Sequence, residues 1–313
     1  MDLYIWSSCN IFNSCNDFIY NIIMIIPIDY KGDTLGFVES RIGGRKENQD
    51  SAGIKDTALG YLVVVCDGMG GMRGGSTASQ LAVRTIIETI ELAGEQSNPS
   101  SCLVNAIKNA NKVIIEKGLQ NPELHGMGTT VTALLFTEFS AFIAYVGDSR
   151  VYQLREGKKI FRTFDHSLVF EMVKKKVISE EQARLSSQSN VILKALGIDN
   201  KVDVEIFERP YLKGDRFILC TDGFWGAMPE EDFIRSVSER DSLDNILVKT
   251  ANVVEGIGRN SGSEYDNLTA AILDMNNNSI LKEKMNKGWK VIIVILSILL
   301  IIGILLSIFY ICS

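Results

Sequence analysis

Two stretches of this chain have the form of a buried strand that ends at an aspartate. Residues 62–71 read Leu-Val-Val-Val-Cys-Asp-Gly-Met-Gly-Gly, and residues 217–223 read Phe-Ile-Leu-Cys-Thr-Asp-Gly. A third acidic residue, Asp266, lies just before the strand-like residues 268–273. Carboxylates at the ends of core strands can converge in one cleft, where they repel one another unless a cation lies between them. The pattern therefore predicts a carboxylate-rich site for Mg²⁺ or Mn²⁺.

The simpler interpretation is that each Asp-Gly pair is only a turn. For a single pair that interpretation is favoured, because Asp-Gly is a strong turn signal. The repetition of the strand-Asp-Gly pattern, together with the motifs described below, favours the metal site.

Charge and cysteine content exclude several classes of protein. The net charge is −6 over 313 residues, so the chain lacks the excess positive charge that is typical of nucleic-acid-binding proteins. An anionic substrate would have to be attracted by metal ions and local arginines. The six cysteines show neither metal-ligand spacing nor a disulfide framework, which indicates a reducing compartment. A phosphatase thiolate in a Cys-x5-Arg loop is also disfavoured, because Met72 stands at that distance from Cys66 and Arg73 comes one residue later.

The far C-terminus has the composition of a membrane span. Residues 291–311 hold no charged residue and would form a helix of about 31 Å, which matches a bilayer core. A buried soluble helix rarely lacks a polar face over this length. Several lysines precede the span and only two uncharged residues follow it, which predicts a tail anchor with the folded part in the cytoplasm. The Asn- and Lys-rich residues 276–290 are the predicted linker, and residues 24–275 the predicted domain.

The N-terminus allows two interpretations. Residues 1–23 carry no basic residue and do not match the layout of a signal peptide. Translation that begins at Met24 would make them a mis-assigned extension, whereas a short membrane-surface segment is the alternative.

The order of predicted elements indicates an α+β fold. Strands before residue 66 are followed by helices that begin at Ser76 and Ser101, then by strands between residues 128 and 154. A helical excursion is predicted over residues 174–196, followed by two strands, a helix from about residue 243 and a final strand. We expect a layered α-β-β-α sandwich of two mainly antiparallel sheets flanked by helices, plus the transmembrane helix.

Short motifs recur along the chain in a fixed order: Arg45 to Ser51, Asp67 to Gly71, Ala78-Ser79, Gly128 to Thr130, Val146 to Tyr152, Thr163 to Ser167, Asn190 to Gly197, Thr221 to Gly223 and Asp266 to Thr269. This ordered set resembles the motifs of the metal-dependent serine/threonine protein phosphatases of type 2C, in their bacterial branch. The resemblance covers about residues 30–275, and no single motif is as specific as the ordered set.

The resemblance implies a two-metal mechanism. Two divalent ions about 3.5–4 Å apart would share and activate a water for in-line attack on a phosphate. Asp67 would bridge both ions, Asp222 and Asp266 would complete one site, and the carbonyl of Gly68 would serve the other. The planar fork of Arg45 would bind the substrate phosphate. The alternative for Arg45 is a surface charge beside a glycine loop.

Asp148 has two interpretations of equal weight. It is a candidate ligand for a third, weaker metal, or part of a hairpin turn in which it and Arg150 are structural partners. We expect a structural role for the neighbouring family motif, with His166 bonded into its loop. A histidine-rich metal site is excluded, because the chain has only two histidines.

Three positions depart from the family pattern. Gln49 replaces an acidic residue of some members, so that the second metal would be held through water or by Asp50. Met69 replaces the histidine that in animal members is thought to protonate the leaving group. Gly226 replaces a further acidic ligand, which weakens the third site.

The sequence therefore predicts a membrane-anchored, cytoplasm-facing phosphatase for phosphoserine and phosphothreonine in proteins. Its cofactors would be two Mn²⁺ or Mg²⁺ ions, with a third in question. Its partners would be substrates of a serine/threonine kinase and the lipid bilayer, with no nucleic acid. The residues around 165–200 would form the family's flap. The alternative is a catalytically weak phosphoprotein-binding or membrane scaffold module that retains the fold.

Overall fold

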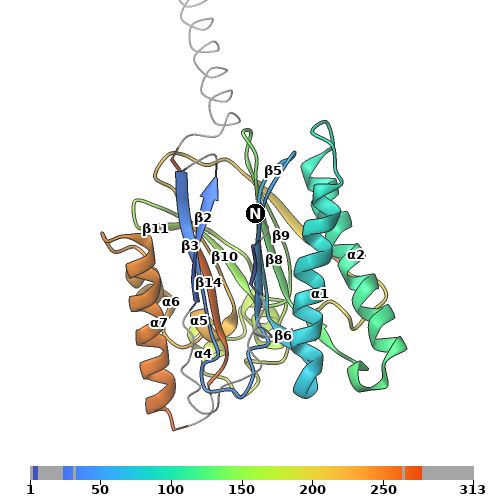
Figure 1. The fold of residues 1–313 in the computed structure, drawn as a ribbon. Helices are drawn as coiled ribbons and strands as arrows, with labels where there is room; N and C mark the ends of the chain where they lie inside the picture. Colours follow the sequence, from blue (N-terminus) through green and yellow to red (C-terminus); the bar gives the residue numbers. More distant parts are fainter. Residues whose placement is uncertain (1–2, 6–23, 31–32, 263–264, 277–313) are drawn as a thin grey trace, which may run out of the picture.

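The computed structural model describes residues 3–5, 24–30, 33–262 and 265–276 and shows two sheets packed face to face between helices (Figure 1). Neighbouring strands in both sheets are antiparallel. The first sheet has the order β1 (Leu3–Ile5), β4 (Ser51–Thr57), β5 (Gly60–Cys66), β8 (Val131–Phe136), β9 (Ala141–Val146) and β12 (Glu205–Arg209). The second has the order β11 (Lys158–Arg162), β10 (Arg150–Arg155), β13 (Arg216–Cys220), β14 (Leu268–Asp274), β3 (Asp33–Arg41) and β2 (Met24–Tyr30). The predicted layered α+β sandwich of antiparallel sheets is confirmed.

The apolar run of β5 is buried on both faces of its sheet. Leu62, Val64 and Cys66 pack against α1 (Gly71–Glu91) and α2 (Pro99–Gln120). Val63 and Val65 point the other way, into the core between the two sheets. Successive side chains of a strand alternate between faces, so a strand that lies between a helix layer and a second sheet has no polar position. This explains why the run lacks the alternation of a half-exposed strand.

The outer face of the second sheet is covered by three helices. These are α5 (Asp222–Trp225), α6 (Glu230–Ser236) and α7 (Leu243–Asn260). Their apolar side chains form a third core with the outward residues of β10, β13 and β14. The two helix layers thus lie on opposite sides of the sandwich (Figure 1).

Helix α1 begins at Gly71, so the predicted start at Ser76 was wrong. The glycines that precede Ser76 suggest a loop, but they form the first turn of the helix. A Cβ on Gly75 would lie 2.6 Å from Oε1 of Gln49 and 2.8 Å from the carbonyl carbon of Gly68. Glycine is therefore required by close backbone approach and does not mark a break in the helix.

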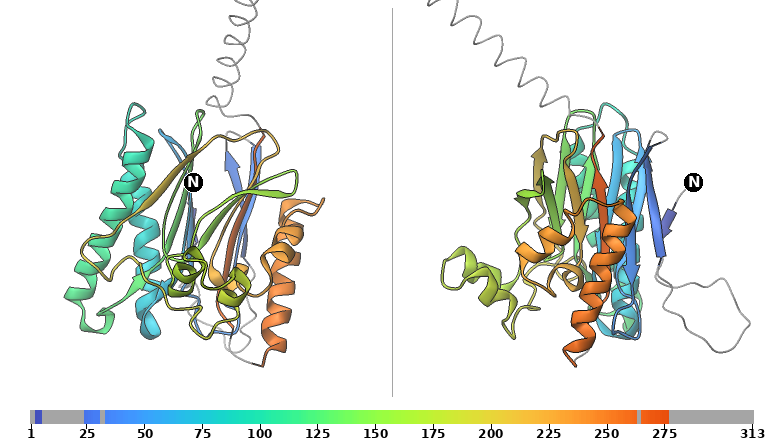
Figure 2. Two further views of the ribbon diagram at one scale, coloured as in Figure 1. Left: turned by 180° about the vertical axis from the view of Figure 1, so that it is seen from behind. Right: turned by 90° about the vertical axis from the view of Figure 1, so that its left-hand side faces the viewer.

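Residues 165–197, called the flap segment below, are only partly helical, whereas a helical excursion was predicted over residues 174–196. They contain two short helices, α3 (Leu168–Lys174) and α4 (Glu180–Arg184), followed by irregular chain. Ser179 and Gln182 form a capping box at the start of α4. Both helices stand off the sandwich, as the yellow-green ribbon at the left of the right-hand view in Figure 2 shows.

Several predictions fall outside the described residues. These are the membrane span 291–311, residues 277–290 of the linker and most of residues 1–23. Within the part of the chain that the structure describes, no helix is both long enough and apolar enough to cross a membrane.

Candidate active site

The strand register brings five aspartates to one edge of the sandwich. In the first sheet, the end of β5 pairs with the start of β4, so Asp67 and Asp50 flank the same edge. In the second sheet, the end of β13 lies opposite the start of β14, which places Asp222 beside Asp266. Asp148 lies in the turn from β9 to β10. We call these five residues the acidic edge.

Asp50 joins the two sheets at this edge. Its side chain is almost fully buried, and its Oδ2 accepts a hydrogen bond of 3.0 Å from the Thr221 hydroxyl at the end of β13. Burial, together with the nearby carboxylates of Asp266 and Asp222, raises the pKa of the Asp50 carboxyl to about 8 against the opposing effect of its hydrogen bonds. The protein therefore holds a carboxyl group where, without a cation, it resists ionisation.

Three other aspartates of the acidic edge show the same effect. Burial raises the pKa of the Asp67 and Asp148 carboxyls well above their ordinary range, and neighbouring carboxylates add to it. Burial and Asp266 raise the pKa of Asp222 to about 6, although a hydrogen bond with Asp67 opposes this rise. Crowded carboxyls of this kind need either protons or cations.

The donor set fits a hard divalent cation. Three buried carboxylate oxygens of the acidic edge have no hydrogen-bond partner in the structure: Oδ1 of Asp50, Oδ1 of Asp148 and Oδ1 of Asp222. A buried polar atom without a partner is costly, and a bound cation would remove this cost. Among the described residues, however, no group of three or more acidic, histidine or cysteine side chains forms a ready-made cage. Coordination would therefore need water and backbone oxygens as well as the carboxylates.

Gly68 offers such a backbone oxygen because its chain is packed too closely for any side chain. A Cβ at this position would lie 2.2 Å from the carbonyl oxygen of Gly75 and 2.6 Å from that of Gln49. The preceding Asp67 is fixed by two threonines: its amide donates to Oγ1 of Thr130 at 3.0 Å, and its carbonyl accepts from Oγ1 of Thr129 at 2.8 Å. The Gly128-Thr-Thr motif thus holds the Asp67 loop.

Arg45 lies at the acidic edge, where its guanidinium binds Asp266. Nε donates to Oδ1 at 3.1 Å and Nη2 to Oδ2 at 2.9 Å, with both side chains partly exposed. The Arg45 loop approaches so closely that a Cβ on Gly43, whose φ is +64°, would lie 2.0 Å from the Asp266 carbonyl oxygen. The structure therefore brings together the predicted phosphate ligand and a predicted metal ligand.

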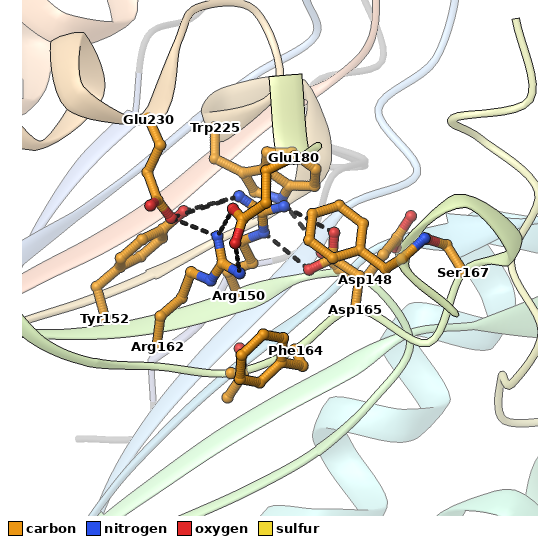
Figure 3. Close-up of polar contacts among 12 residues, drawn as sticks. Asp148, Arg150, Tyr152, Arg162, Phe164, Asp165, Ser167, Glu180, Trp225 and Glu230 are labelled. Carbon is orange, nitrogen blue, oxygen red and sulfur yellow. Dashed lines mark hydrogen bonds and ion pairs between the residues drawn. The ribbon is translucent and has the colours of Figure 1, made fainter. Parts of the chain in front are cut away.

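The Asp148 turn is held by a buried polar cluster (Figure 3). Arg150 binds both oxygens of Asp165 at 2.8 and 2.7 Å and lies 3.9 Å from Glu230 Oε1, whereas the Asp148–Arg150 pairing of the hairpin interpretation is not seen. The expected structural role of His166 is confirmed: Nδ1 accepts from the Gly147 amide at 3.1 Å, which leaves Nε2 to donate to Glu205 at 2.8 Å. Burial lowers the pKa of His166.

Two positioning residues were missed from the sequence. Trp225 donates from Nε1 to the carbonyl of Asp148 at 3.1 Å. Because Trp225 ends the short helix α5 that Asp222 begins, the indole ties two parts of the acidic edge together. Asn267 accepts from the Gln49 amide and donates to the carbonyls of Ile42 and Glu47, which fixes the Arg45 loop. Asn267 could have been found from its position next to Asp266 in a family motif. No feature of the sequence pointed to Trp225.

The sequence is similar to those of known protein phosphatases. Residues 39–261 match the family model of protein phosphatase 2C. The serine/threonine phosphatase stp of Listeria welshimeri is 34% identical over 241 residues, which cover 74% of this chain and 92% of that protein. The serine/threonine protein phosphatase PstP of Mycobacterium tuberculosis is 29% identical over 235 residues, covering 74% of this chain and 43% of that longer protein.

The fold is similar to those of solved serine/threonine phosphatase structures. The serine/threonine phosphatase Stp1 from Staphylococcus aureus has a TM-score of 0.71 at 28% identity, covering 78% of this chain and 96% of that chain. The catalytic domain of PstP, solved in complex with two manganese ions, has a TM-score of 0.63 at 28% identity, covering 76% and 96%.

Proposed function

The chain belongs to the protein phosphatase 2C family of serine/threonine phosphatases, and on this premise we propose that it hydrolyses phosphoserine and phosphothreonine in proteins at the acidic edge. The observation that carries the proposal is the set of unpartnered, buried carboxylate oxygens next to a partly exposed arginine. This arrangement suits a dianionic phosphate ester, because cations and a guanidinium can neutralise it together.

The proposed cofactors are two Mn²⁺ or Mg²⁺ ions, with Asp148 available to a third. Asp67, Asp222 and Asp266 would hold them together with the Gly68 carbonyl, and Asp50 would bind directly or through water. When bound, such ions supply an activated water and neutralise charge on the phosphate. Their binding requires the carboxyls to lose their protons, which the raised pKa values of Asp67 and Asp50 otherwise oppose.

Arg45 would orient the phosphate through its planar pair of N–H donors. No covalent intermediate on a cysteine is proposed. Cys66 and Cys220 are buried, and burial raises the pKa of both thiols, which keeps them protonated and unreactive. The proposed reaction therefore transfers the phosphate directly to water.

The test is phosphate release from a phosphothreonine peptide by the full chain. We expect release with Mn²⁺ and none after EDTA treatment, with recovery when Mn²⁺ is restored. Asp67→Asn serves as the inactive control. Tight binding of the phosphopeptide without release would instead support the catalytically weak binding module.

We also propose that residues 291–311 anchor the protein in a membrane, with the phosphatase domain in the cytoplasm. The support is the uncharged run and the lysines that precede it. Strand β14 (Leu268–Asp274) begins beside Asp266 and runs away from the acidic edge. An anchor that follows Asn276 would leave the acidic edge open to phosphorylated proteins. Sedimentation with membranes that resists high salt and alkaline wash would support the anchor, and release by salt would refute it.

A further inference from the structure

The loop that carries Arg45 leads directly from a buried anchor on β3. Arg41, the last residue of that strand, is 3% exposed. Its Nη1 donates to Oδ1 of Asn252 at 2.7 Å and to Oε2 of Glu255 at 3.1 Å. Both partners belong to α7, which lies against β3 and β14 (Figure 1). Helix α7 is therefore fixed to the strand four residues before the proposed phosphate ligand.

Tyr265 contacts both α7 and the Arg45 loop through its ring. The side chain is partly buried and packs against the third core, which α7 forms with the second sheet. On the helix, a Cβ on Gly258 would lie 2.8 Å from Cδ1 of the ring, and on the loop, a Cβ on Gly44 would lie equally close to the same atom. Glycine at both positions therefore permits an approach that any other residue would prevent.

The backbone of Tyr265 is joined to the same loop. The Gly44 amide donates to the Tyr265 carbonyl at 3.1 Å, and the next residue, Asp266, binds the Arg45 guanidinium. The hydroxyl contributes little, because Nε of Arg259 lies 3.5 Å from it, at the limit of a hydrogen bond. Packing of the ring is therefore the main contact of this side chain with α7 and with the loop.

We propose that Tyr265 is a positioning residue that holds Arg45 in reach of the substrate phosphate, with α7 as its support. The inference rests on the proposed function. Tyr265 lies just outside the family motif that begins at Asp266. Without the ring, the loop would lose the packing that ties it to α7, and the guanidinium would spend less time at the phosphate. Because Arg45 would contact the phosphate group itself, the effect should extend to small and large phosphate esters alike.

The test compares Tyr265→Ala with Tyr265→Phe in the full chain at saturating Mn²⁺. Tyr265→Ala removes the ring and should raise KM about three- to tenfold for both p-nitrophenyl phosphate and a phosphothreonine peptide, with kcat within about twofold. Tyr265→Phe keeps the ring, so both KM values should stay within about twofold of those of the unmodified protein. Leu243→Ala, in the same core at the other end of α7, should lower the thermal midpoint without a change in KM.

Two further comparisons show whether the effect passes through the ring and through Arg45. Gly258→Ala places a methyl group against the ring from the helix side and should raise KM for both substrates. In an Arg45→Ala background, Tyr265→Ala should raise KM by less than about twofold, because the group that it positions is absent. Amide hydrogen exchange over residues 42–48 should be faster in Tyr265→Ala than in Tyr265→Phe.

Unchanged KM in Tyr265→Ala would overturn the proposal, as would an increase of the same size in the Arg45→Ala background. A raised Mn²⁺ requirement in Tyr265→Ala would assign the effect to the neighbouring Asp266 and would also overturn it. If Tyr265→Ala does not fold, Gly258→Ala with and without Arg45→Ala carries the same test.

The exchange comparison separates this proposal from the proposed function. If the unmodified protein released no phosphate from either substrate, the proposed function itself would fail. Faster exchange over residues 42–48 in Tyr265→Ala would still show that the ring fixes the Arg45 loop, whereas equal exchange in Tyr265→Ala and Tyr265→Phe would overturn that role.

Discussion

Arg45 and Asp266 form a two-point ion pair, with N–O distances of 3.1 and 2.9 Å, although we propose that one binds phosphate and the other a cation. In the structure, each residue therefore neutralises the charge of the other and accepts or donates its hydrogen bonds. Binding of a cation by Asp266 would weaken this pair and free the guanidinium. The pair thus links metal binding to phosphate binding, with the metal expected first.

Replacement of Arg45 by lysine tests this link. Lysine keeps the charge but cannot donate two parallel hydrogen bonds. We expect Arg45→Lys to lower kcat/KM for a phosphopeptide about ten- to hundredfold, the loss expected for charge-assisted bonds at a reacting group. Steady-state kinetics at saturating Mn²⁺ measure it, with the neighbouring Lys46→Ala as the control. Unchanged kcat/KM would return Arg45 to the role of a surface charge.

Asp67→Asn tests the bridging carboxylate. The substitution keeps the shape of the side chain and removes the charge that would hold two cations together. Turnover should fall by about 10³-fold or more while the thermal unfolding of the metal-free protein is retained. Asp56→Asn, an exposed position at the far end of the adjacent β4, should leave turnover unchanged. A folded Asp67→Asn protein with near-normal turnover would reject the two-metal assignment.

The raised pKa of Asp50 predicts how stability depends on pH. A carboxyl whose folded-state pKa is about 8, against an ordinary value of 3.8, stabilises the fold while it is protonated. That contribution is complete below about pH 4 and is lost as the pH rises through about 8. The free energy of unfolding of the metal-free protein should therefore fall between pH 6.5 and 8.5, where ordinary carboxyls no longer titrate.

Denaturant unfolding in EDTA across this pH range measures the effect. Asp50→Asn should make the slope shallower, because the amide does not ionise and can still accept the bond from Thr221. Part of the slope should remain, because the pKa values of the Asp67 and Asp148 carboxyls are also raised. Added Mn²⁺ should reduce the slope in the unmodified protein. A free energy of unfolding that rises with pH in EDTA would contradict the assignment.

Sequence reasoning found Asp67, Asp222 and Asp266 because each follows or precedes a strand whose burial is evident from composition, whereas Asp50 and Asp148 came from the resemblance to the family. It failed where tertiary contacts decide the outcome. The glycines before Ser76 suggested a loop, yet they lie inside α1, where the close approach of Gly68 and Gln49 requires glycine at position 75. The role of Trp225 depends on a carbonyl 77 residues away in the chain. The two short helices of the flap segment pack around a small hydrophobic cluster of their own. Hydrophobic periodicity over residues 174–196 did not reveal this cluster.

The cysteines distinguish metal chemistry from thiol chemistry. Cys66 and Cys220 are buried, with the pKa of each thiol raised mainly by burial, so alkylating agents should not reach a reactive thiolate. Treatment with iodoacetamide should leave turnover nearly unchanged, whereas EDTA should abolish it reversibly. Mass spectrometry of the treated protein shows which thiols have reacted. Loss of activity on alkylation together with resistance to chelation would overturn the proposed mechanism.

Deletion of residues 288–313 tests whether the proposed anchor and the acidic edge are independent. Strand β14 ends at Asp274, where the carboxylate binds Arg216 at 2.7 and 2.8 Å, so the sandwich is closed before the deleted region begins. The deletion removes residues 291–311, a run with no charged residue. We expect the truncated protein to remain in the supernatant after ultracentrifugation with lipid vesicles, with kcat/KM on a phosphothreonine peptide within about twofold of the full chain.

Truncated protein that still pellets with vesicles would assign membrane binding to another segment, such as residues 1–23. Loss of turnover would show that the C-terminal residues support the site, because the cores of the sandwich and all five aspartates of the acidic edge remain in the truncated chain.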